Sequence, residues 1–321
     1  MLIAALLILC VMSVMLGAVS ISPKEIFSLL CGNAIKASHR SIILFTRLPR
    51  TAACVLSGAA LAVSGVVIQT VLDNPLSAPN VIGVNSGAGF FAVLSGVILP
   101  STAVFRSLFA FIGALAAVFL VLLISEKSGA SKMTLVLTGI AVSGIFTAGT
   151  EAVISFYPDS VSGYADFRIG GFSGVTARGI FPSAVIIAIS LVVLLFLTNE
   201  LDILALGHNE AKSLGLNASL MRKIFLVLAA ALAGAAVSFS GIIGFVGLLV
   251  PHIMRRFVGS ESRPLILSSV LGGACFMLFS DLVSRLLFRP YELPVGILLS
   301  FLGGPFFIFL ILRQRKGRIH D

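Results

Sequence analysis

Residues that could do chemistry are few in this 321-residue chain, and most of them lie near the ends of apolar segments. Asp73 ends one apolar segment, and Glu151 lies about one helical turn from the end of another. Asp281 and Arg285 are four residues apart, which places them on one helical face where they can form an ion pair. Such a pair could neutralise itself at a helix end or belong to a functional site. No series of acids crosses the apolar segments, so a proton or sodium relay is not indicated.

Motifs for nucleotide, metal or covalent chemistry are absent from the sequence. No GxxxxGK[ST], HExxH or CxxC spacing occurs, so a nucleotide-binding loop and the common zinc sites are not indicated. The four cysteines are scattered. Cys10, Cys54 and Cys275 lie in apolar runs, and Cys31 lies outside them. We therefore expect no catalytic residue, no metal site and no cofactor in this chain.

The composition is that of a membrane protein. Hydrophobic residues make up 58% of the chain and charged residues only 11%, against about 25% in an ordinary soluble domain. With 22 basic and 13 acidic residues, the chain cannot cover the surface of a soluble domain of this length. A soluble enzyme, a nucleic-acid binder and a disordered scaffold are therefore disfavoured. The net charge of +9 is more consistent with basic loops that face anionic lipid head groups.

The elements that must position these residues are apolar helices. A helix needs about 20 residues to cross the hydrocarbon layer. The charge-free runs are 1–23, 51–72, 83–105, 107–125, 133–150, 179–199, 224–251, 264–280 and 293–312. The run 224–251 is too long for one upright helix, so we expect a break near Ser240–Gly241 and a second helix to about Phe257. The prediction is an all-α, polytopic membrane protein with about ten crossings and one domain over residues 1–321.

The loops carry an unusual distribution of charge. Residues 20–50 form an amphipathic segment after the first crossing, and it holds five basic residues: Lys24, Lys36, Arg40, Arg47 and Arg50. Basic residues on an outer loop oppose the positive-inside rule, which indicates that they bind an acidic partner there. Residues 200–223 are polar and helix-prone, so we expect a surface helix there. This helix either transmits the movement of another subunit to the membrane helices or only connects two crossings.

Two segments of the chain match at a constant offset. Gly58-Ala59-Ala60 with Ser64-Gly65 corresponds to Gly234-Ala235-Ala236 with Ser240-Gly241. This match predicts an internal repeat of 51–155 and 224–312, an arrangement common in transporters. Chance matching in a chain with 31 glycines is the alternative.

Several motifs together resemble the FecCD family, the permeases of binding-protein-dependent ABC importers for iron–siderophore, haem and cobalamin. The resemblance runs from about residue 40 to residue 313. The motifs that carry it are Arg47-Leu48-Pro49-Arg50, Ser57-Gly58-Ala59-Ala60, Asn74-Pro75-Leu76-Ser77-Ala78-Pro79, Gly83-Val84-Asn85-Ser86-Gly87, Gly244-Phe245-Val246-Gly247, Pro251-His252-Ile253-Met254-Arg255, Asp281 with Arg285, Glu292-Leu293-Pro294-Val295-Gly296 and Gly303-Gly304-Pro305. Family members often have Trp near Gly170-Gly171, whereas this chain has none.

The resemblance implies a type II importer architecture in the bacterial cytoplasmic membrane. The expected partners are a second permease chain, two cytoplasmic ATPase subunits that bind ATP and magnesium, one extracytoplasmic substrate-binding protein and the lipid bilayer, with no nucleic acid. The residues implied in docking the binding protein are Arg47, Arg50 and Arg285. Those implied at an inner gate are Asn74 and Leu76, with Ser131, Lys132, Met133 and Thr134 opposite. Those implied in ATPase coupling are Glu210, Ala211, Leu214 and Gly215.

Three functions are consistent with this sequence. The first is a non-enzymatic permease that carries an iron–siderophore complex, with haem or cobalamin as alternative cargo. The second is an ion-coupled secondary carrier, which the lack of buried acids disfavours. The third is an intramembrane enzyme, for which no nucleophile or metal ligands stand at recognisable spacing.

Overall fold

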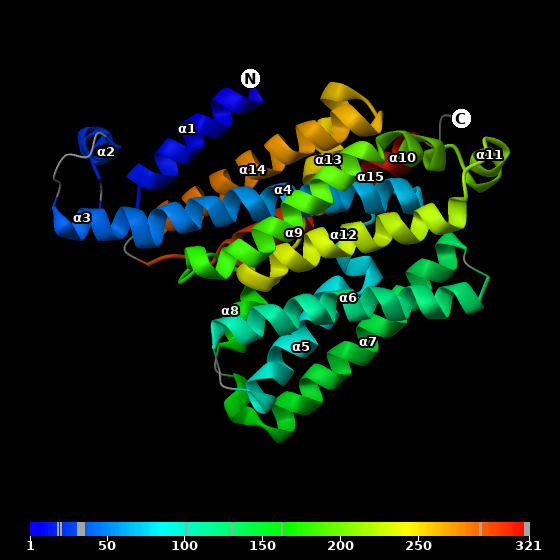
Figure 1. Cartoon of the computed structure of the whole chain (residues 1–321), viewed down its shortest axis with the longest axis horizontal. Coiled ribbons are helices and arrows are strands. Elements are labelled where there is room, and N and C mark those ends of the chain that lie inside the picture. The colour runs from blue at the N-terminus through cyan, green and yellow to red at the C-terminus, as the bar shows by residue number, and fades with distance from the viewer. Residues whose placement is uncertain are drawn as a thin grey trace.

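A computed structural model gives the fold of the chain for residues 1–17, 19, 21–30, 36–99, 102–129, 131–161, 163–288 and 291–317. Those residues form helices and turns, without a strand (Figure 1). The ten helices in the predicted crossings are α1 (Leu2–Met15), α4 (Leu48–Leu72), α5 (Val84–Ile98), α6 (Ala103–Lys127), α7 (Lys132–Phe156), α9 (Ala177–Phe196), α12 (Ala218–Ser240), α13 (Val246–Val258), α14 (Ser262–Leu287) and α15 (Val295–Gly317). The all-α prediction is therefore confirmed.

Short helices stand at the two ends of this bundle. They are α2 (Pro23–Leu30), α3 (Ala37–Ile42), α8 (Tyr164–Ile169), α10 (Thr198–Ala205) and α11 (His208–Ser213), with 3-10 turns at Pro79–Ile82 and Pro158–Val161. In Figure 1, α2, α3 and α8 lie at the left, which we call the α8 end, and α10 and α11 lie at the right, which we call the α11 end.

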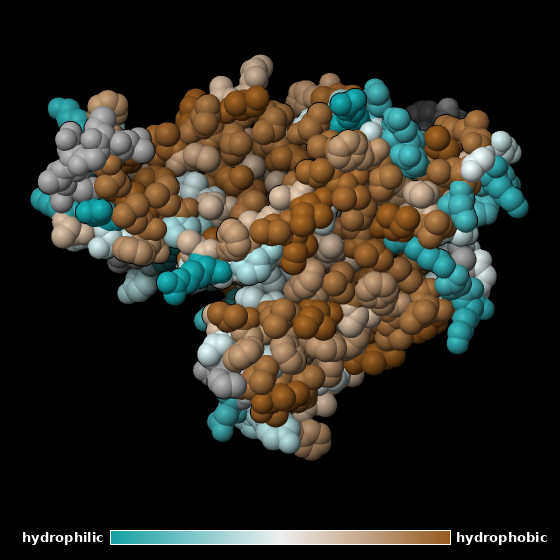
Figure 2. All heavy atoms as spheres, viewed as in Figure 1, coloured by the Kyte–Doolittle hydropathy of each residue, from teal (hydrophilic) through white to brown (hydrophobic). Residues whose placement is uncertain are grey.

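Six helices are long and apolar enough to cross a membrane, as judged by length and composition of the described residues. A 25-residue helix such as α6 or α7 extends about 37 Å, against a hydrocarbon core of about 30 Å. Apolar side chains cover most of the face in Figure 2, and polar side chains gather at its left and right ends. This distribution fits a bilayer whose normal lies along the long axis of the molecule.

The break between α12 and α13 lies where the sequence predicts it. Helix α12 ends at Ser240, and Gly241 has a φ of 69°, a left-handed conformation that favours glycine. Helix α8 and the loop after it satisfy the interrupted backbone, since the N–H of Ile242 donates to Phe167 O (2.8 Å) and the N–H of Gly171 donates to Ser240 O (2.8 Å). Non-helical backbone at membrane depth is tolerated when protein groups satisfy it in this way.

The amphipathic segment 20–50 is not a loop throughout, and the sequence prediction is wrong for its second half. The residues from Ala37 onward form a continuous 36-residue helix, Ala37–Leu72, with a π-helical turn at Ile43–Arg47. The charged residues Arg47 and Arg50 interrupt the apolar run in the sequence, but both are buried. Partners on other helices permit this burial, as the next section describes.

Helix α4 is the centre of the packing, between α12 and α14 (Figure 1). Small residues let its backbone approach its neighbours closely. A Cβ atom on Gly58 would lie 2.2 Å from Gly273 O of α14, and one on Gly65 would lie 1.8 Å from Gly247 O of α13. The internal repeat stays a prediction, although its two glycine-rich segments lie on the neighbouring helices α4 and α12.

Replacement of Gly65 by alanine is expected to destabilise the bundle. The added methyl group would meet backbone, which cannot move aside as a side chain can, so α4 and α13 must separate. Such overpacking costs about 1–3 kcal/mol. The measurement is the thermal unfolding midpoint of the detergent-solubilised chain. Gly144→Ala on α7 is the matched control, because nothing lies within 4 Å of a Cβ atom at that position. Equal midpoints for the two variants would contradict the packing argument.

Candidate functional site

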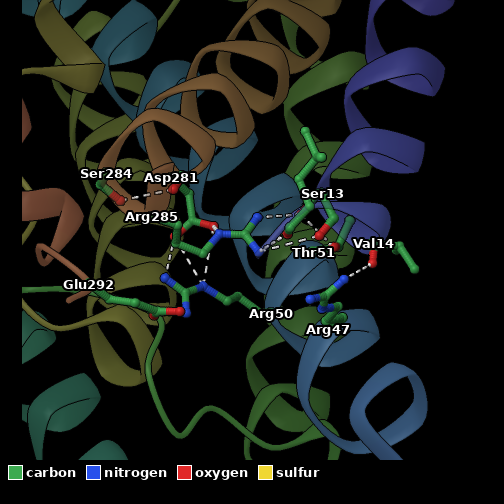
Figure 3. Close-up of polar contacts among 10 residues, drawn as sticks. Ser13, Val14, Arg47, Arg50, Thr51, Asp281, Ser284, Arg285 and Glu292 are labelled. Atoms are coloured by element: carbon green, nitrogen blue, oxygen red, sulfur yellow. Dashed lines mark hydrogen bonds and ion pairs between the residues drawn. The ribbon is translucent and has the colours of Figure 1, made fainter. Parts of the chain in front are cut away.

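A cluster of charged side chains lies at the α8 end of α4 and α14 (Figure 3). We call it the arginine cluster, and its members are Arg47, Arg50, Asp281, Arg285 and Glu292. Helix α4 and the turn before it supply two arginines, α14 supplies Asp281 and Arg285, and the segment before α15 supplies Glu292. The cluster thus joins elements that are far apart in the sequence.

Asp281 is the centre of this cluster and is fully buried, at 0% exposed. Arg50 donates to its carboxylate through Nε and Nη2, with Nη2 2.9 Å from Oδ1. Arg285 Nε lies 3.0 Å from Oδ2, so the ion pair predicted from the four-residue spacing is confirmed. Arg50 also reaches outward, and its Nη1 donates to Glu292 Oε2 at 2.6 Å. Two arginines and two acids therefore balance in charge.

The remaining donors of the cluster hold the end of α1. Arg47 donates to the carbonyl oxygens of Val14 (2.5 Å), Met15 (2.8 Å) and Val19. Arg285 donates to Leu16 O (3.1 Å) and to Ser13 Oγ (3.0 Å). A helix leaves its last four carbonyls without intrahelical partners, and cationic side chains satisfy them well. The cluster therefore fastens α1 to α4 and α14.

The three arginines implied in docking are brought together by the structure but are not presented to a partner. Arg47, Arg50 and Arg285 are between 4% and 8% exposed, and internal groups receive their hydrogen bonds. Their role in docking stays a prediction. Within the described part of segment 20–50, the exposed basic residues are Lys24, Lys36 and Arg40.

A polar contact links the two short helices α2 and α3, which carry Lys24 and Arg40, and Lys36 directly precedes α3. His39 Nδ1 of α3 lies 2.8 Å from Glu25 Oε1 of α2. The Ser22 backbone N–H, followed by the His39 side chain, lowers the pKa of the Glu25 carboxyl below its ordinary value. The contact therefore joins α2 to α3, the helix that carries Arg40.

The residues implied at the gate meet at the α11 end. Asn74 is exposed and forms a turn in which its Oδ1 accepts from the Leu76 N–H at 3.0 Å. Ser131 caps α7 by accepting from the Thr134 N–H at 3.0 Å. Lys132 Nζ lies 3.1 Å from Asp73 Oδ2, which joins the two segments. Met133 is 68% exposed. The segments predicted to face each other are thus adjacent, while their role as a gate stays a prediction.

The residues implied in coupling form a small helix that stands at the edge of the bundle (Figure 1). Ala211 of α11 is fully buried, whereas Glu210 and Leu214 are exposed. Gly215, with φ 82°, donates to Lys212 O (3.0 Å), and the Leu216 N–H donates to Ala211 O (3.0 Å). These two hydrogen bonds form a common C-terminal helix motif, in which the residue at the position of Gly215 must adopt the left-handed conformation. Because Ala211 anchors α11 to the bundle, the exposed Glu210 and Leu214 are held in place for contact with another protein.

Some site residues have no distinctive signal in the sequence. Gln69 of α4 is 2% exposed, donates to Gly247 O (3.0 Å) and accepts from Arg255 of α13. A single glutamine in an apolar run gives no indication of its partners. Glu292 stands in a motif of the resemblance, but only the structure identifies its partner as Arg50.

The described residues contain no group of three or more His, Cys, Asp or Glu that could hold a metal ion. The chain is a multi-pass membrane protein by its membrane-length helices, with a buried charge cluster at one end and a surface helix at the other. Residues 5–313 match the FecCD transport family, and the chain belongs to this family.

Two curated relatives cover almost the whole chain. The chain is 36% identical over 307 residues to the Fe(3+)-citrate import system permease protein YfmE of Bacillus subtilis, a match that covers 95% of this chain and 92% of the relative. It is 36% identical over 320 residues to the hemin transport system permease protein HmuU of Yersinia pestis, covering 98% and 94%. A solved inward-facing structure of a metal-chelate type ABC transporter matches with a TM-score of 0.86 and 30% identity over 97% of each chain.

Proposed function

We propose that this chain is one of two permease subunits of an ATP-driven importer that carries an iron–siderophore complex across the bacterial cytoplasmic membrane. In this arrangement the α8 end faces outward to a substrate-binding protein, and the α11 end faces two ATPase subunits. The chain performs no covalent chemistry and supplies a pathway with two states. Docking at one end and ATP-driven closure at the other favour different states.

The observation that carries the proposal is helix α11. It is anchored through one fully buried alanine, it ends at a left-handed glycine, and it presents a polar face with exposed Leu214. It stands at the end opposite the arginine cluster and shares that end with the Asn74 and Lys132 segments. A helix held in this way can transmit movement of an attached subunit to the membrane helices.

An ion-coupled carrier is less compatible with the charges of the bundle. Among the residues that the structure describes, Asp281 is the buried acid, and two arginines neutralise it. A coupling acid must instead gain and lose an ion during the cycle. The proposal is tested in vesicles that contain the chain alone or with its ATPase and binding-protein partners. Accumulation of labelled ferric chelate is expected only in the complete, ATP-supplied vesicles, and accumulation by the chain alone would refute the proposal.

The cargo class follows from the relatives rather than from a pocket. Relatives at the same identity carry names of ferric citrate and hemin systems, so haem is the second candidate. Competition for uptake between a labelled ferric siderophore and unlabelled hemin, in the vesicles described above, distinguishes them.

Charge reversal on the exposed basic surface is expected to weaken docking of the binding protein. Lys36→Glu with Arg40→Glu should reduce affinity about tenfold, because exposed charge pairs each contribute about 0.2–1 kcal/mol and the loss of two corresponds to about 1.4 kcal/mol. The measurement is binding of the substrate-binding protein to the full chain in nanodiscs. Arg47→Gln with Arg50→Gln is the comparison variant, since those residues are buried. If the comparison variant keeps its fold but loses more affinity for the binding protein, the arginine cluster and not the exposed surface is the docking site.

A further inference from the structure

A cavity of about 360 Å³ lies at the α8 end, apart from the arginine cluster and from α11. Four elements line it: the first turns of α6, the end of α8 with the following loop, the first turns of α9 and the end of α12. Figure 2 shows the molecule indented at the left, between the start of α9 and the start of α6. No role in the proposed transport cycle accounts for this cavity.

The wall of the cavity is apolar and opens sideways along α6. Its apolar lining includes Leu108, Phe111, Ile186 and Phe239. Leu108 is 51% exposed, so this wall continues onto the outer surface of the helix bundle. In a membrane that surface contacts hydrocarbon. Within the cavity, the Ser183 and Ser238 hydroxyls hydrogen-bond each other at 2.9 Å, so they leave little unsatisfied polarity in the wall.

The rim of the cavity carries charge. Arg106 lies in the first turn of α6 and Arg178 in the first turn of α9, so both stand where helices leave the hydrocarbon. Arg106 donates to Gly163 O at 2.9 Å through Nη1, which fixes its position. Arg178 is exposed and makes no hydrogen bond or ion pair with any other residue in the part of the chain that the structure describes. Asp166 also lines the rim, so the three side chains leave a net charge of one positive unit.

The geometry points to a phospholipid site, with the lipid phosphate at Arg106 and Arg178 and one acyl chain along the apolar wall between α6 and α9. A single phosphodiester carries one negative charge and complements the rim. Arginine is well suited to phosphate because its planar group presents several donors. A free phosphate would leave the apolar wall in water, and a hydrocarbon without phosphate would leave Arg178 without a partner. A glycerophospholipid satisfies both parts.

Three ligands test the phosphate contact and the acyl-chain contact separately. Dioleoyl phosphatidylglycerol has phosphate and acyl chains, dioleoylglycerol has only the chains, and glycerol phosphate has only the phosphate. Native mass spectrometry of the full chain in detergent measures the binding of each. We expect one phosphatidylglycerol per chain to bind at least about tenfold more tightly than dioleoylglycerol, because its phosphate can accept charge-assisted hydrogen bonds from the two arginines. Glycerol phosphate is expected not to bind. Equal binding of phosphatidylglycerol and dioleoylglycerol would overturn the phosphate assignment.

Variants place the lipid in this cavity. Arg178→Gln should weaken phosphatidylglycerol binding about tenfold, and Ser107→Phe, which fills the cavity from α6, should weaken binding of both lipids. Arg168→Gln is the matched control, because Arg168 is an exposed arginine of α8 that does not line the cavity. Equal losses in Arg178→Gln and Arg168→Gln would overturn the site in favour of a nonspecific surface charge. Unchanged lipid binding in Ser107→Phe would also overturn the site.

Discussion

Asp281→Asn is expected to be the most destabilising single change in the arginine cluster. It removes the charge that compensates two buried guanidinium groups, and breaking a buried ion pair from one side costs about 3–5 kcal/mol. The thermal unfolding midpoint of the detergent-solubilised chain should fall by at least about 6 °C, on the scale typical of proteins of this size. Because Arg285 also holds Ser13 and Leu16, protease cleavage near the end of α1 should become faster.

Two further variants separate lost charge balance from a general defect. Glu292→Gln removes an acid with a 37% exposed side chain, and its effect should be less than a third of that of Asp281→Asn. The double variant Asp281→Asn with Arg285→Gln should be more stable than the sum of the single effects predicts, because it removes one uncompensated buried charge. Strict additivity in this cycle would show that the cluster does not act as a unit.

Gly215→Arg is expected to uncouple ATP hydrolysis from transport. An arginine at a φ of 82° is strained by roughly 1–2 kcal/mol, and its side chain would project beside Leu214 on the surface proposed to meet the ATPase. Uptake of ferric chelate in complete vesicles should fall at least about tenfold, equivalent to about 1.4 kcal/mol. ATP hydrolysis by the same vesicles should persist.

The control for this prediction is Gly215→Asn. Asparagine accepts the left-handed conformation more readily than other side chains, and no atom lies within 4 Å of a Cβ atom at this position. This variant should retain most of the uptake. Full uptake by Gly215→Arg would falsify the assignment of α11 as the coupling element, while loss of uptake in both variants would show that glycine is required for another reason.

The helices and their break could be predicted because the signals are local. A charge-free run of sufficient length forms a helix in lipid wherever the chain places it, since the backbone has no other hydrogen-bonding partners there. Gly241 marks the break because its φ of 69° suits glycine, and the spacing of Asp281 and Arg285 already requires that they share a face. The glycine that ends α11 is likewise a local signal.

The surroundings of the charged residues were decided by the tertiary structure. Arg50 was predicted on an outer surface because it follows the first crossing and because the resemblance implied a docking role. Its carboxylate partner Asp281 lies 231 residues away in the sequence, so nothing local indicated that Arg50 is buried. Whether a charge can be buried depends on the partners that the fold brings to it. The cavity between α6 and α9 has the same origin, since each of these helices supplies one arginine and part of the apolar wall, and only their packing brings the two parts together. The sequence by itself determined a membrane-embedded helical protein, because hydropathy and helical period act over one or two turns, and its motifs together resembled the FecCD permeases. Only the packed bundle determined which charges are internal supports and which are free for ligands, because that depends on contacts between distant segments.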